Sequence, residues 1–220
     1  MARTLIVGAS GGIGRALVQS LQSRGESVAV LSRSSDGLDL TDEESVMDRL
    51  GRLYGTFDRI VVATGALSGP GRGPEKSLKS LDPEAAAALF ALNAIGPTLV
   101  LKHALRLMPR DRRSVFAALS ARVGSIGDNR LGGWYSYRAS KAALNQLVHT
   151  AAIEVSRSHP EAICVVLHPG TVATGFTRDY RNHPAVSSQQ AAVNLLGVLD
   201  GLSTADTGGF FDWASQPVPW

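Results

Sequence analysis

The chain has 220 residues, 44% of them hydrophobic and 19% charged, a composition that fits one globular domain spanning residues 1–220. The formal net charge is only +3, and the basic residues are scattered rather than grouped with aromatic ones, which argues against a nucleic-acid surface. The single cysteine, Cys164, excludes a disulfide framework, so a reducing cytoplasm is the expected location. We expect no membrane span, because no run reaches roughly 18 apolar residues, and no metal, because the histidines lack ligand spacing.

Apolar runs and helical spacings alternate along the chain. The run that ends at residue 63 is continuously apolar, as a parallel strand covered on both faces should be. Strands are expected over 4–7, 28–31, 58–63, 114–119 and 163–167, with a short strand over 37–40 and a terminal strand over 208–213. Helices are expected over 13–24, 42–53, 82–107, 135–156 and 187–202. This alternation is typical of an α/β fold with helices on both faces of a parallel sheet.

A glycine-rich stretch joins the first predicted strand to the first predicted helix. Glycines allow a sharp turn and a close approach to a ligand, and the first amides of a helix lack intrahelical partners, so this junction can bind an anion. The glycine spacing differs from the common dinucleotide fingerprint, although the strand-to-helix position agrees with it. The candidate phosphate-binding residues are Gly8, Ser10, Gly11, Gly12, Ile13 and Gly14.

The same stretch allows a second interpretation. Residues 8–12 match the G-x-S-x-G pattern of a hydrolase nucleophile elbow, with Ser10 as the nucleophile. Against this, the first strand would present Ser10, with no upstream chain to build an oxyanion loop. Both interpretations stay open at this point.

The second predicted strand ends at Ser32, Arg33 and Ser34. In a dinucleotide fold, this strand end meets the adenosine ribose, where an acidic residue would bind the 2′-hydroxyl and repel a 2′-phosphate. Arg33, with two flanking hydroxyls, instead offers a positive charge and donors that suit the phosphate. The sequence therefore favours NADP over NAD, although a solvated surface arginine is the plainer alternative.

The long helix expected over 82–107 contains a proline. Pro97 cannot donate a hydrogen bond to the carbonyl four residues back, which belongs to Asn93. A structural interpretation is a simple kink, whereas a functional one is a water molecule bound at the free acceptor of Asn93. The sequence leaves both possible.

Tyr137 and Lys141 lie about 40° apart on one helical face, whereas Tyr135 points about 240° away from the lysine. A lysine ammonium beside a phenol favours the phenolate, so Lys141 is expected to lower the pKa of Tyr137 and to make it a proton donor or acceptor. The sixth predicted strand leads into His168 and a tight loop over 169–174, and His168 is expected to be a hydrogen-bonded structural residue. The segment 175–183 is a candidate lid over the substrate.

With these residues in hand, the sequence resembles the short-chain dehydrogenase/reductase family over nearly its whole length. The motifs that carry the resemblance are Gly8-x-x-x-Gly12-Ile13-Gly14, Asp39-Leu40-Thr41, Asn93, Tyr137-x-x-x-Lys141 and Pro169-Gly170-Thr171-Val172-x-Thr174. The segment 121–129, with Gly133-Trp134-Tyr135, is similar to bacterial C-factor-like members and their carbonyl-reductase relatives. The resemblance implies a single Rossmann-like domain with a parallel sheet of about seven strands.

The resemblance also implies roles for individual residues. Tyr137 would be the acid/base, Lys141 would hold the nicotinamide ribose, and Asn93 would hold a relay water. The cofactor would also contact Asp39 and Leu40 at the adenine, Ala63, Thr64 and Gly65 at its centre, and Pro169, Gly170, Val172 and Thr174 at the nicotinamide amide. The serine that normally polarises the substrate has no certain counterpart, because Ser120 is followed by Ala121, so Ser120 and Ser125 are both candidates.

Taken together, the sequence predicts an NADP(H)-dependent oxidoreductase that acts on a small carbonyl or alcohol. Carbonyl reduction is favoured over alcohol oxidation, because cells hold NADP mostly reduced. A nucleotide-binding sensor or signalling protein with the same fold is the second hypothesis, since the absent serine would permit low turnover. The hydrolase hypothesis leaves Tyr137, Lys141 and Asn93 unexplained. Family members usually pair through helices corresponding to 92–107 and 137–156, so a homodimer or homotetramer is expected.

Overall fold

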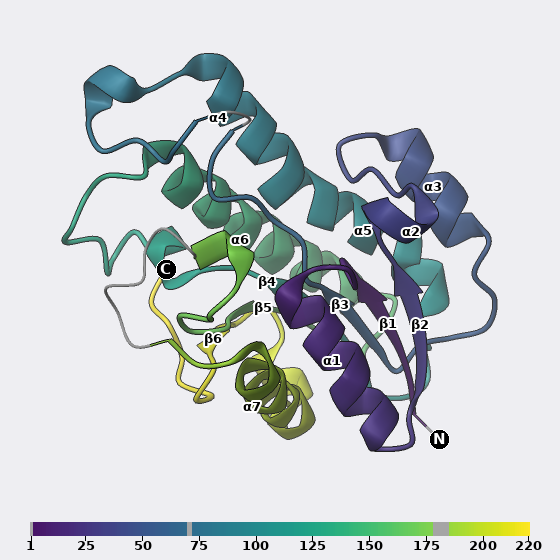
Figure 1. Cartoon of the computed structure of the whole chain (residues 1–220). Helices are drawn as coiled ribbons and strands as arrows, with labels where there is room; N and C mark the ends of the chain where they lie inside the picture. The colour runs from purple at the N-terminus through teal and green to yellow at the C-terminus, as the bar shows by residue number, and fades with distance from the viewer. Residues whose placement is uncertain (1, 70–71, 178–184) are drawn as a thin grey trace.

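The structure is a computed structural model that describes residues 2–69, 72–177 and 185–220. Within these ranges, six parallel strands form one sheet in the order β2-β1-β3-β4-β5-β6 (Figure 1). The strands are β1 (Arg3–Val7), β2 (Ser27–Leu31), β3 (Arg59–Val62), β4 (Ser114–Leu119), β5 (Ala162–His168) and β6 (Phe210–Asp212). The strand order reverses its direction between β1 and β3, and a crevice opens beyond the carboxyl ends of the strands at such a point.

Helices cover both faces of the sheet (Figure 1). One face is covered by α1 (Gly12–Ser23) and α7 (Ser188–Gly201), whose leucines pack against alternate residues of the strands. The other face is covered by α3 (Glu43–Gly51), α5 (Gly96–Ala104) and α6 (Tyr135–Val155), with α4 (Pro83–Phe90) packed on α6. The α/β fold class predicted from the sequence is thereby confirmed, with a doubly covered parallel sheet.

The alternation along β4 and β5 decides where polar residues at the strand ends point. Leu119 and Leu167 are register partners and both face the layer of α1 and α7. Because successive side chains point to opposite faces of a sheet, Ser120 and His168 face the layer of α6. Both residues therefore lie on the side of the sheet that carries Tyr137.

The short strand expected over 37–40 does not form. The Oδ1 atom of Asp39 accepts hydrogen bonds from the amide and the hydroxyl of Thr41, at 2.8 and 2.7 Å, and the amide of Asp39 donates to Ser45. These local bonds satisfy backbone groups that a strand would use for its ladder. Leu38 and Leu40 are nevertheless buried, which explains why the segment looks like a strand in the sequence.

The helix expected over 82–107 contains a π-helical turn, Ala91–Ile95, between α4 and α5. The amide of Gly96 donates to the carbonyl of Ala91, which lies five residues earlier in the chain. Gly96 is followed directly by Pro97, which has no amide hydrogen to donate. The kink expected at this proline is thus a π-helical turn that contains Asn93. π-Helical turns of this kind often occur at functional sites.

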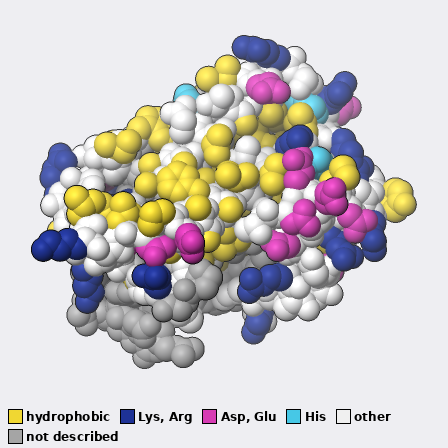
Figure 2. Space-filling view, turned by 90° about the horizontal axis from the view of Figure 1, so that it is seen from above, with side chains coloured by type: hydrophobic (Ala, Val, Ile, Leu, Met, Phe, Trp, Pro, Cys, Tyr) yellow, Lys and Arg dark blue, Asp and Glu magenta, His cyan; other side chains and the backbone are white. Residues whose placement is uncertain are grey.

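The run Pro83–Leu107, judged over the described residues, is long and apolar enough to cross a membrane by length and composition alone. That finding qualifies the expectation that no apolar run reaches this length. In the fold, the run packs against α6 and buries Leu89, Ala94, Val100 and Leu101. Figure 2 views the molecule from above and shows apolar side chains gathered near the middle of that face of the molecule, with Lys and Arg mixed among Asp and Glu around them.

Candidate active site

The glycine-rich stretch forms a tight loop between β1 and α1, as predicted. Gly8 has a φ of +93°, and a Cβ atom there would lie 2.9 Å from the backbone of Ala63. A Cβ on Gly14 would lie 2.2 Å from the carbonyl oxygen of Gly8. The N-cap of α1 is Gly11, and a glycine has no side chain that could accept hydrogen bonds from the first amides of the helix. These amides remain available to an anion such as a phosphate.

Ser10, the nucleophile of the hydrolase hypothesis, is exposed on this loop. Its carbonyl oxygen accepts a hydrogen bond from Arg15 at 3.0 Å. Among the described residues, no histidine or carboxylate is hydrogen-bonded to its hydroxyl. The arrangement offers no nucleophile and base pair of the kind that a serine hydrolase needs.

A cavity of about 590 Å³ opens beyond the carboxyl ends of β1, β3, β4 and β5. It brings together thirteen of the candidate residues, which are Gly11, Gly12, Ile13, Ala63, Thr64, Gly65, Ser120, Tyr137, Lys141, Pro169, Gly170, Val172 and Thr174. Two lining residues lie close together in this cavity, because a Cβ atom added to Gly12 would lie only 2.7 Å from the side chain of Thr174. The hydroxyl oxygen of Thr64 is buried and has no hydrogen-bond partner among the described residues.

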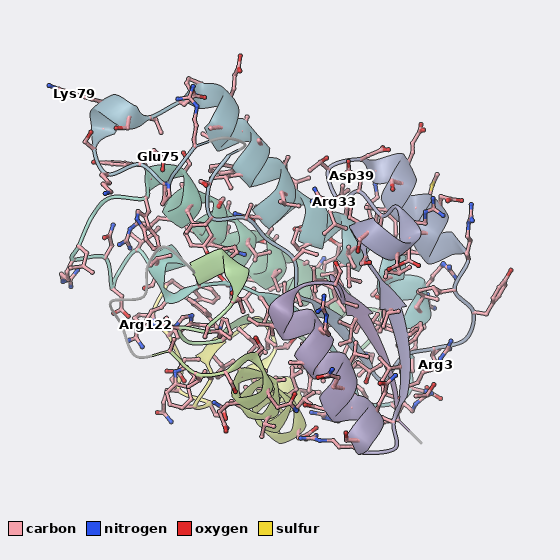
Figure 3. The ribbon with its side chains drawn as sticks, in the orientation of Figure 1. Arg3, Arg33, Asp39, Glu75, Lys79 and Arg122 are labelled. Atoms are coloured by element: carbon pink, nitrogen blue, oxygen red, sulfur yellow. The ribbon has the colours of Figure 1, made fainter. Side chains whose placement is uncertain are left out.

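The residues expected at the adenosine end lie outside this cavity, after β2. Ser32 is buried and caps the short helix α2 (Arg33–Asp36) by accepting a hydrogen bond from the amide of Ser35. Arg33 and Ser34 are exposed. Hydrogen bonds from Thr41 lower the pKa of Asp39, with a smaller contribution from the positive charge of Arg33. Figure 3 shows Arg33 and Asp39 near one another above the end of β2.

Tyr137 and Lys141 lie on one buried face of α6, 5% and 3% exposed. The ammonium of Lys141 donates a hydrogen bond of 2.8 Å to the carbonyl of Leu119, and burial lowers the pKa of this lysine to about 7. Burial raises the pKa of Tyr137 well above its ordinary value. The pKa of Tyr137 is therefore raised and not lowered as the spacing of Tyr137 and Lys141 predicted, because burial removes the phenol from water.

Asn93 joins three parts of the site and is completely buried. Its side-chain amide accepts a hydrogen bond from the amide of Ala66 and donates one to the carbonyl of the same residue, both at 2.8 Å. It also donates to the hydroxyl of Ser140 on α6 at 3.1 Å. The side chain thus fixes the loop after β3 relative to the helix that carries Tyr137. Whether its backbone carbonyl holds a water stays a prediction.

Comparison with known proteins agrees with this geometry. The family model described as enoyl-(acyl carrier protein) reductase matches residues 8–201. The chain belongs to the short-chain dehydrogenase/reductase family. It is therefore an oxidoreductase, and the family predicted from the sequence motifs is confirmed.

The similarity to individual relatives covers most of the length of this short-chain dehydrogenase/reductase. It is 32% identical over 226 residues to 1-hydroxy-2-glutathionyl-2-methyl-3-butene dehydrogenase of Rhodococcus sp. (strain AD45), with 96% of each chain covered. It is 36% identical over 135 residues to C-signal of Myxococcus xanthus, covering 61% of this chain and 78% of that protein. The NADPH-bound carbonyl reductase from chicken fatty liver matches with a TM-score of 0.82 at 22% identity, covering 100% of this chain and 94% of that chain.

The two candidate serines of this family member are both occupied in other contacts. Ser120 lines the cavity, but its hydroxyl donates a 2.6 Å hydrogen bond to the side chain of Asn145 on α6. A hydroxyl carries a single proton, so in this arrangement Ser120 presents only an acceptor to a substrate oxygen. Ser125 is 1% exposed, accepts a hydrogen bond from the amide of Asp128 and is not among the residues that line the cavity. Ala121 lines it instead.

Two aromatic residues that surround Tyr137 come from the irregular segments 125–134 and 175–183, which the sequence indicated for the substrate pocket without giving either residue a role. Trp134 and Phe176 place their rings 6.1 and 6.0 Å from the ring of Tyr137. His168 also lines the cavity, and its buried Nδ1 atom has no hydrogen-bond partner among the described residues. The expectation of a hydrogen-bonded structural histidine is thus not met at Nδ1. Burial lowers the pKa of His168 to about 4 and keeps it neutral at pH 7. Most of the candidate lid, residues 178–183, lies outside the described residues.

Proposed function

We propose that this protein reduces small carbonyl compounds with NADPH and that Tyr137 donates the proton taken up by the carbonyl oxygen. The observation that carries the proposal is the position of Tyr137, a buried phenol in the cavity that also contains the glycine-rich loop. Burial raises the pKa of Tyr137, so the phenol carries its proton at neutral pH and has one to donate to a carbonyl oxygen. Oxidation of an alcohol would need the phenolate, which burial disfavours.

The residues present fit a dinucleotide. A side chain on Gly12 would collide with Thr174 where both residues line the cavity, so glycine keeps this part of the cavity wall clear for a ligand. The buried hydroxyl of Thr64 offers an unused donor and acceptor. The amides at the start of α1 would hold the phosphates, and Pro169–Thr174 would hold the nicotinamide amide. When bound, NADPH supplies the hydride. The chicken carbonyl reductase, which shares the fold, binds NADPH in its structure.

Lys141 and Asn93 would assist Tyr137, Lys141 by its charge and Asn93 by its position. The ammonium of Lys141 would bind the nicotinamide ribose, while its bond to Leu119 holds the side chain beside the cavity. The backbone carbonyl of Asn93, in the π-helical turn before Pro97, would hold a water that returns a proton toward Lys141 and Tyr137. Asp39 and Leu40 would flank the adenine. These roles follow from the family resemblance and stay predictions.

Arg33 should decide the preference for NADPH over NADH. Arg33→Ala is expected to raise the dissociation constant of NADPH about 10- to 100-fold, because a hydrogen bond between charged groups is lost, and to leave that of NADH unchanged. Fluorescence titration with each nucleotide measures both constants. Arg52→Ala, which removes an exposed arginine at the end of α3, serves as the control. Equal effects on NADPH and NADH would contradict a contact between Arg33 and the 2′-phosphate.

Ala121 and Ser120 allow a second test, of how the substrate oxygen is polarised. Ala121→Ser is expected to raise kcat for 4-nitrobenzaldehyde about tenfold, because it adds a hydroxyl donor to the lining of the cavity. Ser120→Ala is expected to change kcat less than about threefold, because the Ser120 proton already binds Asn145. Steady-state kinetics with NADPH measures both. A hundredfold loss in Ser120→Ala would instead identify Ser120 as the polarising group.

A nucleotide-binding sensor or signalling protein remains the second candidate function. It is favoured by one observation, that the hydroxyl protons of Ser120 and Ser125 are not presented to the cavity, which would permit slow turnover. The similarity to C-signal agrees with this candidate by name. A biological activity that survives Tyr137→Phe would favour the sensor over the reductase.

We also propose that the protein is a homodimer or homotetramer. The helices from α4 to α6 leave large apolar side chains in solvent, among them Ile95, Leu147 and Ile153. Pairing through these helices would remove that apolar surface from water.

A further inference from the structure

Glu75 is a buried carboxylate that the proposed reaction does not use. It lies in the segment between β3 and α4, it is 8% exposed, and it is not among the residues that line the cavity. Figure 3 shows Glu75 beside the first turn of α6. Carboxylates are seldom buried without donors that stabilise their charge, so its surroundings carry information about its role.

The donors to Glu75 come from the N-terminus of α6. The hydroxyl of Ser136 donates to one carboxylate oxygen, and the amide of Ser136 donates to the other at 3.3 Å. The amide of Trp134 donates to the backbone carbonyl of Glu75 at 2.5 Å. The N-cap of this helix is Trp134, whose indole makes no capping bond. Glu75, 61 residues earlier than Ser136, therefore takes the position that a capping carboxylate occupies, where the helix dipole favours a negative charge.

The capped helix end is strained and lies next to Tyr137. Three successive residues before the helix have a left-handed backbone, with φ values of +64° at Gly132, +66° at Gly133 and +52° at Trp134. Glycines adopt this conformation easily, but a tryptophan rarely does. The guanidinium of Arg138 donates to the carbonyls of Gly133 and Gly132 at 2.9 and 3.1 Å. The ring of Trp134 packs edge-on against Tyr137 at 6.1 Å.

We infer that Glu75 is a positioning residue that fixes the first turn of α6, and with it Trp134 and Tyr137, to the segment that follows β3. This inference deepens the proposed function and rests on it for the role of Tyr137. Glu75 acts through Ser136 and Trp134. Removal of its carboxylate leaves the amide and hydroxyl of Ser136 buried without this acceptor and loosens the first turn of α6, to which Trp134 is joined.

Kinetics test the consequence for the reaction. Glu75→Ala is expected to lower kcat for reduction of 4-nitrobenzaldehyde about 100-fold, because a displacement of about 1 Å at a reacting group costs that much, and to leave the dissociation constant of NADPH within about twofold. Glu75→Gln, which keeps the size and one acceptor, should recover part of the loss. Glu84→Ala, an exposed glutamate in the first turn of α4, is the matched control and should resemble the wild type. A kcat within about threefold of this control in both Glu75 variants would overturn the inference.

Coupling tests the route through Ser136. If Glu75 acts through the Ser136 hydroxyl, Ser136→Ala and Glu75→Gln remove the same interaction, so their effects on kcat are not additive. The double variant is then no slower than the slower single variant. Losses that multiply in the double variant would show that Glu75 acts elsewhere and would overturn the route proposed here. Both substitutions are close to isosteric, so they also keep the test valid where Glu75→Ala does not fold.

A readout without turnover separates this inference from the proposed function. Replacing Trp213 and Trp220 by phenylalanine leaves Trp134 as the sole tryptophan of the chain. In that background, Glu75→Gln is expected to shift the emission of Trp134 to longer wavelength and to raise its quenching by acrylamide, whereas Glu84→Ala changes neither. Unchanged emission and quenching would overturn the positioning role even if the protein is an active reductase. A shift in a protein without reductase activity would refute the proposed function alone.

Discussion

Replacement of Tyr137 by phenylalanine is expected to lower kcat for carbonyl reduction about 1,000-fold and to leave NADPH binding unchanged. The substitution removes one hydroxyl from a buried ring and keeps the contacts of that ring with Trp134 and Phe176. The proton for the carbonyl oxygen must then come from water, and general acid catalysis by a positioned side chain contributes on the order of 100- to 10,000-fold. Steady-state kinetics with 4-nitrobenzaldehyde and a fluorescence titration with NADPH measure the two effects.

Tyr135→Phe is the matched control for this experiment. It makes the same chemical change two residues earlier on α6, where Tyr135 is 39% exposed and does not line the cavity. Its kcat should equal that of the wild type. If Tyr137→Phe keeps more than a tenth of the turnover, the proton donor is another group, and the neutral imidazole of His168, which lines the same cavity, becomes the next residue to replace.

Patterns of local sequence were sufficient to predict most of the fold and the centre of the site. The short, continuously apolar runs became strands because a parallel sheet covered on both faces buries every residue of its inner strands, as β4 shows with all six residues buried. The pair of Tyr137 and Lys141 was predictable because helical spacing alone places both side chains on one face. The glycine-rich loop was predictable because glycine is required where a Cβ would meet backbone atoms.

The features that escaped prediction depend on contacts between distant segments. The hydroxyl of Ser120 was taken as a candidate donor, but the alternation along β4 directs it toward Asn145 on α6. The pKa of Tyr137 depends on how completely the fold removes the phenol from water, which no spacing in the sequence reveals. Glu75 contacts a serine 61 residues away, and no local pattern marks it.

The second large effect concerns Lys141 and the dependence of stability on pH. Burial lowers the pKa of Lys141 from 10.5 to about 7, while the unfolded chain keeps the ordinary value. Between these two values, the unfolded state binds more protons than the folded state, so the free energy of unfolding rises as the pH rises from about 7 to 10.5. A change of one unit in pKa corresponds to about 1.4 kcal/mol, so the increase in the free energy of unfolding due to Lys141 reaches at most about 5 kcal/mol. Below pH 7, both states carry the charge, and the full cost of burying it remains.

Lys141→Met removes this charge and keeps the aliphatic part of the side chain. The variant is therefore expected to be more stable than the wild type at pH 6, with a difference that shrinks steadily between pH 7 and 10. Urea unfolding at pH 6, 8 and 10 measures the difference directly, and other titrating groups cancel because both proteins contain them. Lys79→Met, at an exposed lysine, should show no such trend. A difference for Lys141→Met that stays constant with pH would mean that the lysine is as readily protonated in the folded protein as in water, and it would contradict the lowered pKa of Lys141.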